Sequence, residues 1–391
     1  LAAPTVTLSS SASSVAENES DLTLTATLNR QTFEDVTVTL TGTGTSTAGT
    51  DYASLSTITI SAGNTTGTTT FNPTDDSVYE GSETAIIAIT GVSGGDATES
   101  GTQSKTITIT DNETAPTVTL STSASSVAEN GSDLTLTATL SGATSEDVTV
   151  TLTGTGTSTA GTDYASLSTI TISAGNTTGT TTFNPTDDSV YEGSETAIIA
   201  ITGVSGGDAT ESGTQSKTIT ITDNETAPTV TLSTSASSVA ENGSDITLTA
   251  TLSGATSEDV TVTLTGTGTS TAGTDYASLS TITISAGSTT GTTTFNPTDD
   301  SIYEGSETAI IAITGVSGGD ATENATQSET ITITDNESAP TVTLSTSASS
   351  VAENGSDLTL TATLSVATTA DVTVTLTGTG TSTAGTDYAS L

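Results

Sequence analysis

The residues of this sequence that are best suited to chemistry are acidic, and they recur as four groups. Between residues 1 and 113 these groups are Glu17, Asp51, the run from Asp75 to Glu83, and Asp111-Asn112-Glu113. Carboxylates are hard oxygen ligands, and Ca²⁺ takes roughly six to eight such oxygens, whereas Mg²⁺ demands strict octahedral geometry. Closely spaced pairs such as Asp75-Asp76 therefore indicate two or more calcium ions that share bridging carboxylates.

Composition narrows the chemistry further. The chain of 391 residues contains no Cys and no His, which excludes disulfides, soft-metal sites and histidine bases. Its 45 acidic residues face three basic ones, Arg30, Lys105 and Lys217, and the net charge is −42. Such a charge excludes attraction to nucleic acid or to anionic lipid. The acids lack cationic partners, so they must either be solvated or hold metal.

The sequence also bears on localisation. No run of about 20 apolar residues is present, so no transmembrane helix is predicted. The start at Leu1 shows neither Met nor a basic segment, so no signal peptide is visible and we expect mature protein or an excised fragment. Low basicity and the absence of Cys favour a secreted bacterial protein, located extracellularly or at the cell surface.

The elements that must position these acids are repeated. The string Ala-Pro-Thr-Val-Thr-Leu recurs with its proline at Pro4, Pro116, Pro228 and Pro340, a period of 112 residues. This length is that of a self-contained domain and too long for a solenoid repeat. We expect three complete domains at 1–113, 114–225 and 226–337. Residues 338–391 carry only the N-terminal half of a fourth.

Within a repeat, apolar and polar residues alternate over short runs. In the second repeat, the runs expected to form strands lie at 117–120, 134–140, 148–152, 170–172, 197–201 and 219–221. Period-two alternation predicts antiparallel strands with one buried face, and about seven such strands predict a two-sheet sandwich. A disordered Thr/Ser-rich stalk and a cross-β aggregate are the alternatives, which the regular alternation, the Gly and Pro content and the charge disfavour.

A sandwich would bring the acids together. Each group lies at a strand end or in a loop, and alternate strand ends meet at the same pole. Two carboxylates about 4 Å apart repel by roughly 1 to 4 kcal/mol, so convergence requires a cation. For isolated acids such as Asp96 and Glu99, we favour a solvated surface role instead.

Four motifs carry a family resemblance. Val-Ala-Glu-Asn, Ala-Gly-Thr-Asp-Tyr, Asp-Asp-Ser-Val-Tyr-Glu-Gly-Ser-Glu and Ile-Thr-Asp-Asn-Glu follow one another in every complete repeat, with one Val-to-Ile change in the third. In this order and spacing the repeat resembles the Calx-beta domain, found in sodium/calcium exchangers, an integrin subunit and very large secreted or surface proteins of bacteria. The resemblance implies an immunoglobulin-like Greek-key β-sandwich with Ca²⁺ bound at one pole.

The same resemblance implies the ligands, several Ca²⁺ ions at or near the inter-domain junctions. They would be Glu17, Asp51, Asp75, Asp76, Glu80, Glu83, Asp111 and Glu113 in the first repeat; Glu129, Asp163, Asp187, Asp188, Glu192, Glu195, Asp223 and Glu225 in the second; and Glu241, Asp275, Asp299, Asp300, Glu304, Glu307, Asp335 and Glu337 in the third. The fourth repeat has only Glu353 and Asp387. High-affinity members carry longer aspartate runs, which Ser77 and Asn112 interrupt here, so the resemblance does not fix the number of ions or the affinity. Extracellular calcium modules often have dissociation constants of about 10⁻⁴ to 10⁻³ M, and we expect that range here.

The last motif adjoins the next domain. Only a few residues separate Asp111 from the strand after Pro116, and the proline biases Ala115 to an extended form. Calcium at such a short joint would stiffen the array. We therefore expect a structural stalk or filament segment of a bacterial adhesin-like surface protein. A ligand- or glycan-binding adhesive module and a regulatory calcium sensor are the alternatives. We expect no enzyme, no catalytic residue and no nucleic-acid partner.

The expected partners are further repeats of the same chain, with homo-assembly by strand addition or end-to-end contact as a possibility. The half domain offers a reason, because residues 340–391 hold only about three strands. Either they are a piece of a longer chain, or another copy supplies the missing strands by β-strand addition.

Overall fold

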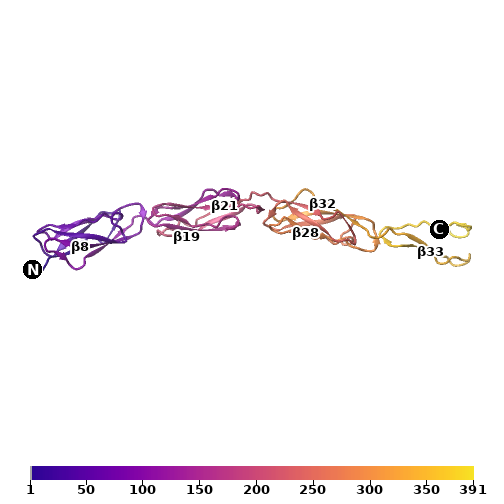
Figure 1. The fold of residues 1–391 in the computed structure, drawn as a ribbon, viewed down its shortest axis with the longest axis horizontal. Helices are drawn as coiled ribbons and strands as arrows, with labels where there is room; N and C mark the ends of the chain where they lie inside the picture. The colour runs from indigo at the N-terminus through magenta and orange to yellow at the C-terminus, as the bar shows by residue number, and fades with distance from the viewer. Residues whose placement is uncertain (1) are drawn as a thin grey trace. The chain divides into compact units, whose positions relative to one another are not determined.

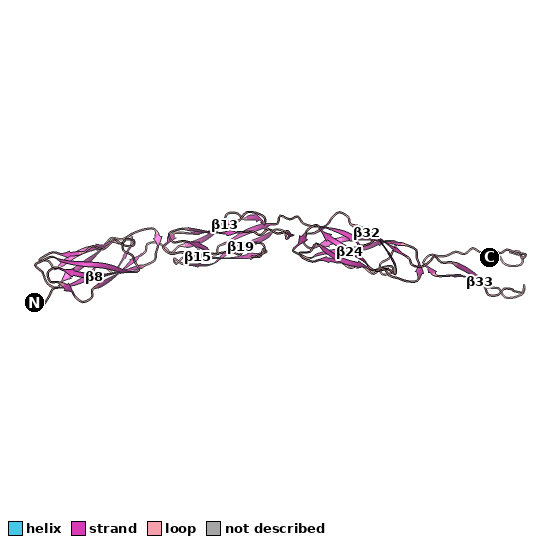
Figure 2. Cartoon of the chain, viewed as in Figure 1, coloured by secondary structure: helices cyan, strands magenta, loops and turns pink. Residues whose placement is uncertain are grey.

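The computed structural model describes residues 2–391, and within them every regular element is a β-strand (Figure 2). No helix in this range is long and apolar enough to cross a membrane. Two compact units make up the chain: Leu1–Asp187 with Ser194–Thr222, and Asp188–Gly193 with Asp223–Leu391. The first unit holds the first repeat and most of the second, and both units are built from the same sandwich (Figure 1).

The first repeat consists of two sheets. Its strands are β1 (Thr5–Ser10), β2 (Ser14–Ala16), β3 (Leu22–Leu28), β4 (Val36–Gly44), β5 (Ile58–Ile60), β6 (Thr66–Phe71), β7 (Val78–Tyr79), β8 (Glu83–Ser93), β9 (Thr98–Glu99) and β10 (Ser104–Thr110). One sheet has the order β6-β3-β1-β9 and the other β2-β10-β8-β4-β5. The short β7 belongs to neither sheet.

Alternation explains why these segments pair. In β3, Leu22, Leu24, Ala26 and Leu28 are buried, while the threonines between them face outward or are half-buried. Both sheets direct such residues into one core. There Tyr52 stacks on Phe71 with ring centroids 4.8 Å apart. Gly42 is required beside this pair, because a Cβ at that position would lie 2.1 Å from the Tyr52 hydroxyl.

The later repeats reproduce this plan. Their strands are β11 (Thr117–Thr122), β12 (Ser126–Ala128), β13 (Leu134–Leu140), β14 (Ala143–Thr144), β15 (Val148–Gly156), β16 (Ile170–Ile172), β17 (Thr178–Phe183), β18 (Val190–Tyr191), β19 (Glu195–Ser205), β20 (Thr210–Glu211), β21 (Ser216–Thr222), β22 (Thr229–Thr234), β23 (Ser238–Ala240), β24 (Ile246–Leu252), β25 (Ala255–Thr256), β26 (Val260–Gly268), β27 (Ile282–Ile284), β28 (Thr290–Phe295), β29 (Ile302–Tyr303), β30 (Glu307–Ser317), β31 (Thr322–Glu323) and β32 (Ser328–Thr334). Each complete repeat again has one four-stranded and one five-stranded sheet.

The fourth repeat contains β33 (Val342–Thr346), β34 (Leu360–Leu364) and β35 (Ala367–Thr368). The first two form an antiparallel hairpin. Val342 and Leu344, whose counterparts are buried in the complete repeats, are 41% and 56% exposed here. The hairpin therefore lacks the second sheet that would cover its apolar face.

The prediction of an all-β array of immunoglobulin-like sandwiches is confirmed, but the complete repeats have more strands than the seven expected. The strand that the alternation missed most clearly is β6, Thr-Gly-Thr-Thr-Thr-Phe, in which only Phe71 is a buried apolar residue. It lies at the sheet edge beside β3, where backbone hydrogen bonds stabilise a strand with almost no apolar signal.

Candidate metal centre

Strand register places the acidic motifs of the first repeat at one end of the five-stranded sheet. Thr110 lies opposite Ala16, so the parallel strands β10 and β2 end together, directly before Asp111 and Glu17. The antiparallel β8 begins with Glu83 at this same end. The loop after β4 carries Asp51 there, since Gly44 at the end of β4 lies opposite Ala85. Acids from four distant segments are thus brought to one pole.

The acids form two groups of three. In the linker group, one carboxylate oxygen each from Glu17, Asp111 and Glu113 lies within 4.8 Å of the others. In the loop group, the same holds for Asp51, Glu80 and Glu83. Glu17 and Asp51 are buried, at 6% and 9% exposure, and the other four are half-buried. Asp75 and Asp76, also predicted as ligands, are exposed and belong to neither group.

Asp111 ties the two groups together. Its Oδ2 accepts hydrogen bonds from the backbone N–H groups of Glu80, at 2.5 Å, and Gly81, at 2.7 Å. Its Oδ1 accepts from the N–H of Glu113 at 2.7 Å. One carboxylate therefore anchors the acidic loop and the start of the inter-repeat linker to the end of β10.

The remaining acids shape the loops. The Oδ2 of Asp51 accepts from the N–H of Thr47 at 2.5 Å, and the backbone N–H of Thr74 donates to the Asp51 carbonyl oxygen at 2.9 Å. Asp76 closes a tight turn by accepting from the N–H of Val78 at 2.7 Å. Asp76 is also close enough to raise the pKa of Glu80, after burial and Asp51. It thus lies beside the loop group as a contributor to its negative field.

The donor set fits calcium. A Ca–O distance of about 2.4 Å allows oxygens around one ion to lie up to about 4.8 Å apart, and the oxygens of each group all lie within 4.8 Å of one another. Oε1 of Glu17 and Oε2 of Glu83 and Glu113 are buried without a hydrogen-bond partner. Unpartnered buried carboxylate oxygens are costly, and a divalent cation would satisfy them.

The same crowding perturbs protonation in the metal-free site. Burial, a hydrogen bond with Glu113 and the negative charges of Asp111 and Glu113 raise the pKa of Glu17 to about 8. Burial, a hydrogen bond with Asp51 and the charges of Asp51 and Glu80 raise the pKa of Glu83 to about 7. Both carboxylates hold a proton where an isolated glutamate would not, so metal binding must displace protons.

The third repeat repeats this arrangement. Glu241, Asp335 and Glu337 form its linker group. Burial and neighbouring acids raise the pKa of Glu241 to about 7, with Glu337 as its hydrogen-bond partner. Burial and a hydrogen bond with Asp275 raise the pKa of Glu307 to about 7. Burial and Asp275 likewise raise the pKa of Glu304.

Two further acids of the third repeat have individual partners. Burial alone would raise the pKa of Asp335, but N–H donors from Gly305, Glu337 and Glu304 lower it. Asp299 is exposed and accepts a hydrogen bond from the Asn336 side chain at 2.6 Å. Its neighbour Asp300 closes the turn that Asp76 closes in the first repeat, through the N–H of Ile302 at 2.7 Å.

In the second repeat, the corresponding residues are divided between the two compact units, so the first and third repeats define the geometry. Asp223 accepts from the N–H groups of Glu192, at 2.6 Å, and Gly193, at 2.7 Å, as Asp111 does. It also accepts from Glu225 at 2.7 Å. Two other predicted ligands accept backbone hydrogen bonds, Asp163 from the N–H of Thr159 and Asp188 from the N–H of Val190. Glu129 is buried and Asp187 is exposed. Glu195 is the first residue of β19.

The fourth repeat has only fragments of a site. Glu353 and Asp387 are exposed. Asp387 still accepts from the N–H of Thr383 at 2.7 Å, as Asp51 does from Thr47. The loop therefore keeps its local geometry without the acids that would complete the group.

The sequence pattern did not indicate that the acidic loop also joins neighbouring repeats. Its β7 pairs in parallel with β14 of the second repeat, Val78 opposite Ala143 and Tyr79 opposite Thr144. The Tyr79 hydroxyl donates to Oδ2 of Asp208 at 3.1 Å. In the second unit β18 pairs with β25 and β29 with β35 in the same way. The one feature of the sequence that could have indicated this joint is Tyr79, an aromatic residue inside an otherwise acidic run.

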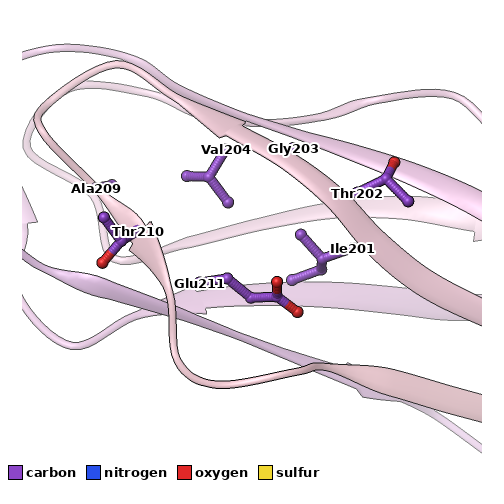
Figure 3. Close-up of a pocket in the computed structure, with 7 residues that line it drawn as sticks. All are labelled: Ile201, Thr202, Gly203, Val204, Ala209, Thr210 and Glu211. Atoms are coloured by element: carbon purple, nitrogen blue, oxygen red, sulfur yellow. The ribbon is translucent and has the colours of Figure 1, made fainter.

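A surface hollow of the second repeat is unrelated to these acids. It has a volume of about 270 Å³ and is lined by residues of β19 and β20, among them Ile201, Val204 and Glu211 (Figure 3). Ile201, the first of the β19 residues that line it, lies six positions along β19 from Glu195, roughly 20 Å away at strand rise. Glu211 is engaged internally, accepting from the N–H of Gln215 at 2.5 Å.

Comparison with known protein families identifies the repeats. A model of the LapA domain matches residues 113–226 and 226–336, more than half of the chain, and the chain belongs to this family. The Calx-beta domain model matches residues 2–113 and 335–391. The expected resemblance to tandem Calx-beta repeats is thereby confirmed.

Several solved structures are similar at low identity. The crystal structure of CBD12 from CALX1.2 is 14% identical over 55% of this chain and 99% of that chain, with a TM-score of 0.26. The calcium binding domain CBD12 of CALX1.1 is 18% identical over 49% and 76%, with a TM-score of 0.24. Surface layer protein SbsC, domains 1-6, is 14% identical over 93% and 64%, with a TM-score of 0.19. No curated protein matches the chain.

Proposed function

We propose that this chain is a calcium-stiffened structural array, a stalk or filament segment of a bacterial extracellular surface protein. The observation that carries the proposal is that the same acidic loop contains two carboxylates of the loop group, Glu80 and Glu83, and the strand β7, which pairs with the next repeat. Glu80 directly follows β7, the strand that pairs with the next repeat, and belongs to the loop group with Asp51 and Glu83. An ion bound there would hold the position of β7.

The linker group, at the same pole of the repeat, supports the same role through the covalent connection to the next repeat. Glu113 belongs to it and lies three residues before Pro116, which leads into β11 of the second repeat. The acidic groups therefore adjoin two connections to the next repeat. One is the backbone pairing of β7 with β14, and the other is the linker that leads from Glu113 to β11. Calcium bound by both groups would restrain the two connections together, which is the mechanical requirement of a stiff stalk.

Calcium binding is tested by calorimetric titration of the full chain. We expect several ions per complete repeat with dissociation constants of about 10⁻⁴ to 10⁻³ M, the range of extracellular modules. A matched variant, Glu83→Gln with E195Q and E307Q, should lose the loop-group ions and retain those of the linker group. Absence of any calcium heat would refute the proposal.

Stiffening is tested separately by small-angle scattering with calcium and with a chelator. We expect larger and better-defined dimensions with calcium, because the joints are restrained. Unchanged dimensions would leave a calcium-binding protein without the structural role. A regulatory sensor would instead change conformation at submicromolar to micromolar calcium.

An adhesive glycan-binding module is the second candidate. Sugar platforms need exposed aromatic residues, and of the aromatic side chains in residues 2–391 Tyr52 and Phe71 are buried, with the same residues buried in each complete repeat. Phe33 alone is fully exposed, and the other repeats have serine or threonine at the equivalent position. A catalytic role is likewise not part of the proposal, since the sequence supplies neither His nor Cys.

A further inference from the structure

The joint between the first two repeats uses a defined surface of the second. We call it the receiving face, formed by residues 143–145 and Asp208. Ala143 and Thr144 pair with β7, and the N–H of Ser145 donates to the Tyr79 carbonyl oxygen at 3.1 Å. Asp208 accepts the tyrosine hydroxyl at 3.1 Å. The third repeat has the same face, where Asp320 accepts from Tyr191 at 3.1 Å.

The first repeat carries an equivalent face at residues 31–33 and Asp96, and no strand of the described chain pairs with it. Its internal geometry is nevertheless the same. Thr32 Oγ1 donates to the Glu34 carbonyl oxygen at 2.8 Å, as Thr144 does to that of Glu146 at 2.5 Å. The N–H of Gly63 donates to the Thr32 carbonyl oxygen at 2.9 Å.

Backbone conformation agrees with this. Asp96 has a φ of 52°, and Asp208 and Asp320, which do receive a tyrosine, each have a φ of 48°. Positive φ is uncommon for a residue other than glycine, so Asp96 keeps an unusual conformation although no tyrosine bonds to it. The receiving face is therefore built into the repeat and does not depend on a docked strand.

The free face also differs in composition. Arg30, Gln31 and Phe33 replace Gly142, Ala143 and Ser145. They line a surface cavity of about 700 Å³ together with Thr32 and Asp96. Phe33 is fully exposed, so this face presents apolar area where the second repeat has Ser145. Arg30 adds one of only three basic side chains in the protein.

We propose that the receiving face of the first repeat binds an acidic loop whose centre is an aliphatic-tyrosine pair and which lies outside residues 1–391. The equivalent faces of the later repeats identify the occupant, because each of them pairs with a two-residue strand of this type. The three described segments of this type, β7, β18 and β29, each pair with the repeat that follows them, so none of them occupies this face. Gln31 and Thr32 pair with its backbone, and Asp96 accepts the tyrosine hydroxyl.

The substitutions on this face select the occupant. Acidic residues flank the Val-Tyr pair in loops of the Asp-Asp-Ser-Val-Tyr-Glu type, and Arg30 brings a cation to them where the second and third repeats have glycine. Phe33 offers apolar area to the aliphatic residue. The first repeat thus prefers an incoming loop by charge and apolar contact, in addition to the backbone pairing that all the faces share.

The test uses the full chain and a synthetic peptide with the sequence of residues 184–195. The protein contains four phenylalanines, of which Phe71, Phe183 and Phe295 are fully buried, so fluorine-labelled phenylalanine gives one exposed NMR reporter, Phe33. We expect peptide to shift the Phe33 resonance saturably with a millimolar dissociation constant while the other three stay in place. A peptide carrying Tyr191→Ala should cause no shift.

Asp96→Gly is the matched protein variant, since glycine adopts the positive φ and removes only the acceptor. We expect it to weaken binding about tenfold, the value of one hydrogen bond to a charged group. Arg30→Gly should also weaken binding, and this loss of affinity should be larger at low ionic strength than at high ionic strength. An unmoved Phe33 resonance, or equal affinity of the Asp96→Gly variant and the parent, would overturn the proposal.

Discussion

The linker group and the loop group of the first repeat contain similar side chains at the same pole, yet they restrain different parts of the molecule. In the linker group, Glu17 follows β2, Asp111 follows β10, and Glu113 lies in the chain to the next repeat. In the loop group, Glu80 follows β7, which leaves its own sheets to pair with β14. Similar carboxylates therefore act on different parts of the molecule, because the segments that carry them lead to different neighbours.

The largest expected effect comes from the residue that joins both groups. Asp111→Ala, made together with D223A and D335A, removes three charge-assisted hydrogen bonds per repeat and one proposed calcium ligand. We expect a loss of about 3 kcal/mol in the unfolding free energy per repeat without calcium, measured by urea denaturation. Calcium should stabilise this variant less than the parent.

The control is Glu19→Gln, which removes one negative charge from an exposed residue near Glu17. It should change stability by less than about 0.5 kcal/mol. If Asp111→Ala behaved like this control, the two groups would not be coupled through Asp111.

The second expected effect concerns pH. The folded pKa values of Glu17, about 8, and Glu83, about 7, exceed their ordinary value of 4.5. Metal-free protein binds these protons more tightly when folded, so their stabilising contribution is complete below about pH 4.5 and lost as pH rises to about 8. Urea midpoints of dialysed protein should therefore fall between pH 5 and pH 8.

Saturating calcium should abolish this fall, because the ion replaces the protons. Calcium affinity should in turn rise across the same pH window. Urea midpoints that are independent of pH in the metal-free protein would contradict the protonated state of the two glutamates.

The third effect separates the groups. Glu17→Gln, with E129Q and E241Q, should weaken calcium binding while leaving hydrogen exchange at β14 close to that of the parent. Glu83→Gln, with E195Q and E307Q, should weaken calcium binding and also abolish the calcium-dependent protection of Ala143 and Thr144. Equal exchange at β14 in both variants would remove the mechanical distinction between the groups.

The smallest effect isolates the joint itself. Tyr79→Phe removes only the hydroxyl that donates to Asp208. We expect it to cost about 1 kcal/mol in local opening of β14, seen as faster amide exchange near Ser145, with calcium affinity unchanged. Lower calcium affinity in this variant would show that the joint and the loop group are one site.

Much of the fold was predictable because its signals are local. Period-two alternation in segments such as Leu134–Leu140 reports a half-buried strand without any knowledge of its neighbours. By contrast, β6 has nearly no apolar alternation and β7 has two residues, so neither carries a periodic signal. Their pairing depends on backbone groups presented by distant strands, which composition does not encode.

The candidate site divides in the same way. The four acidic motifs and their convergence at one pole were predicted from their places at strand ends. The partition into two groups was not, nor was the exposed position of Asp75 outside both. Side-chain direction within a loop depends on the backbone donors that hold each carboxylate, as Asp111 shows.

The sequence alone determined the repeat, the all-β class, the surplus of carboxylates and the absence of soft-metal ligands, since these follow from residue types and spacing. The tertiary structure decided which carboxylates lie close enough to share an ion, that the same loop pairs with the next repeat, and that Thr32 and Asp96 have the local geometry of the paired faces. These features depend on the register between strands far apart in the chain, where one residue of slippage would redirect every side chain.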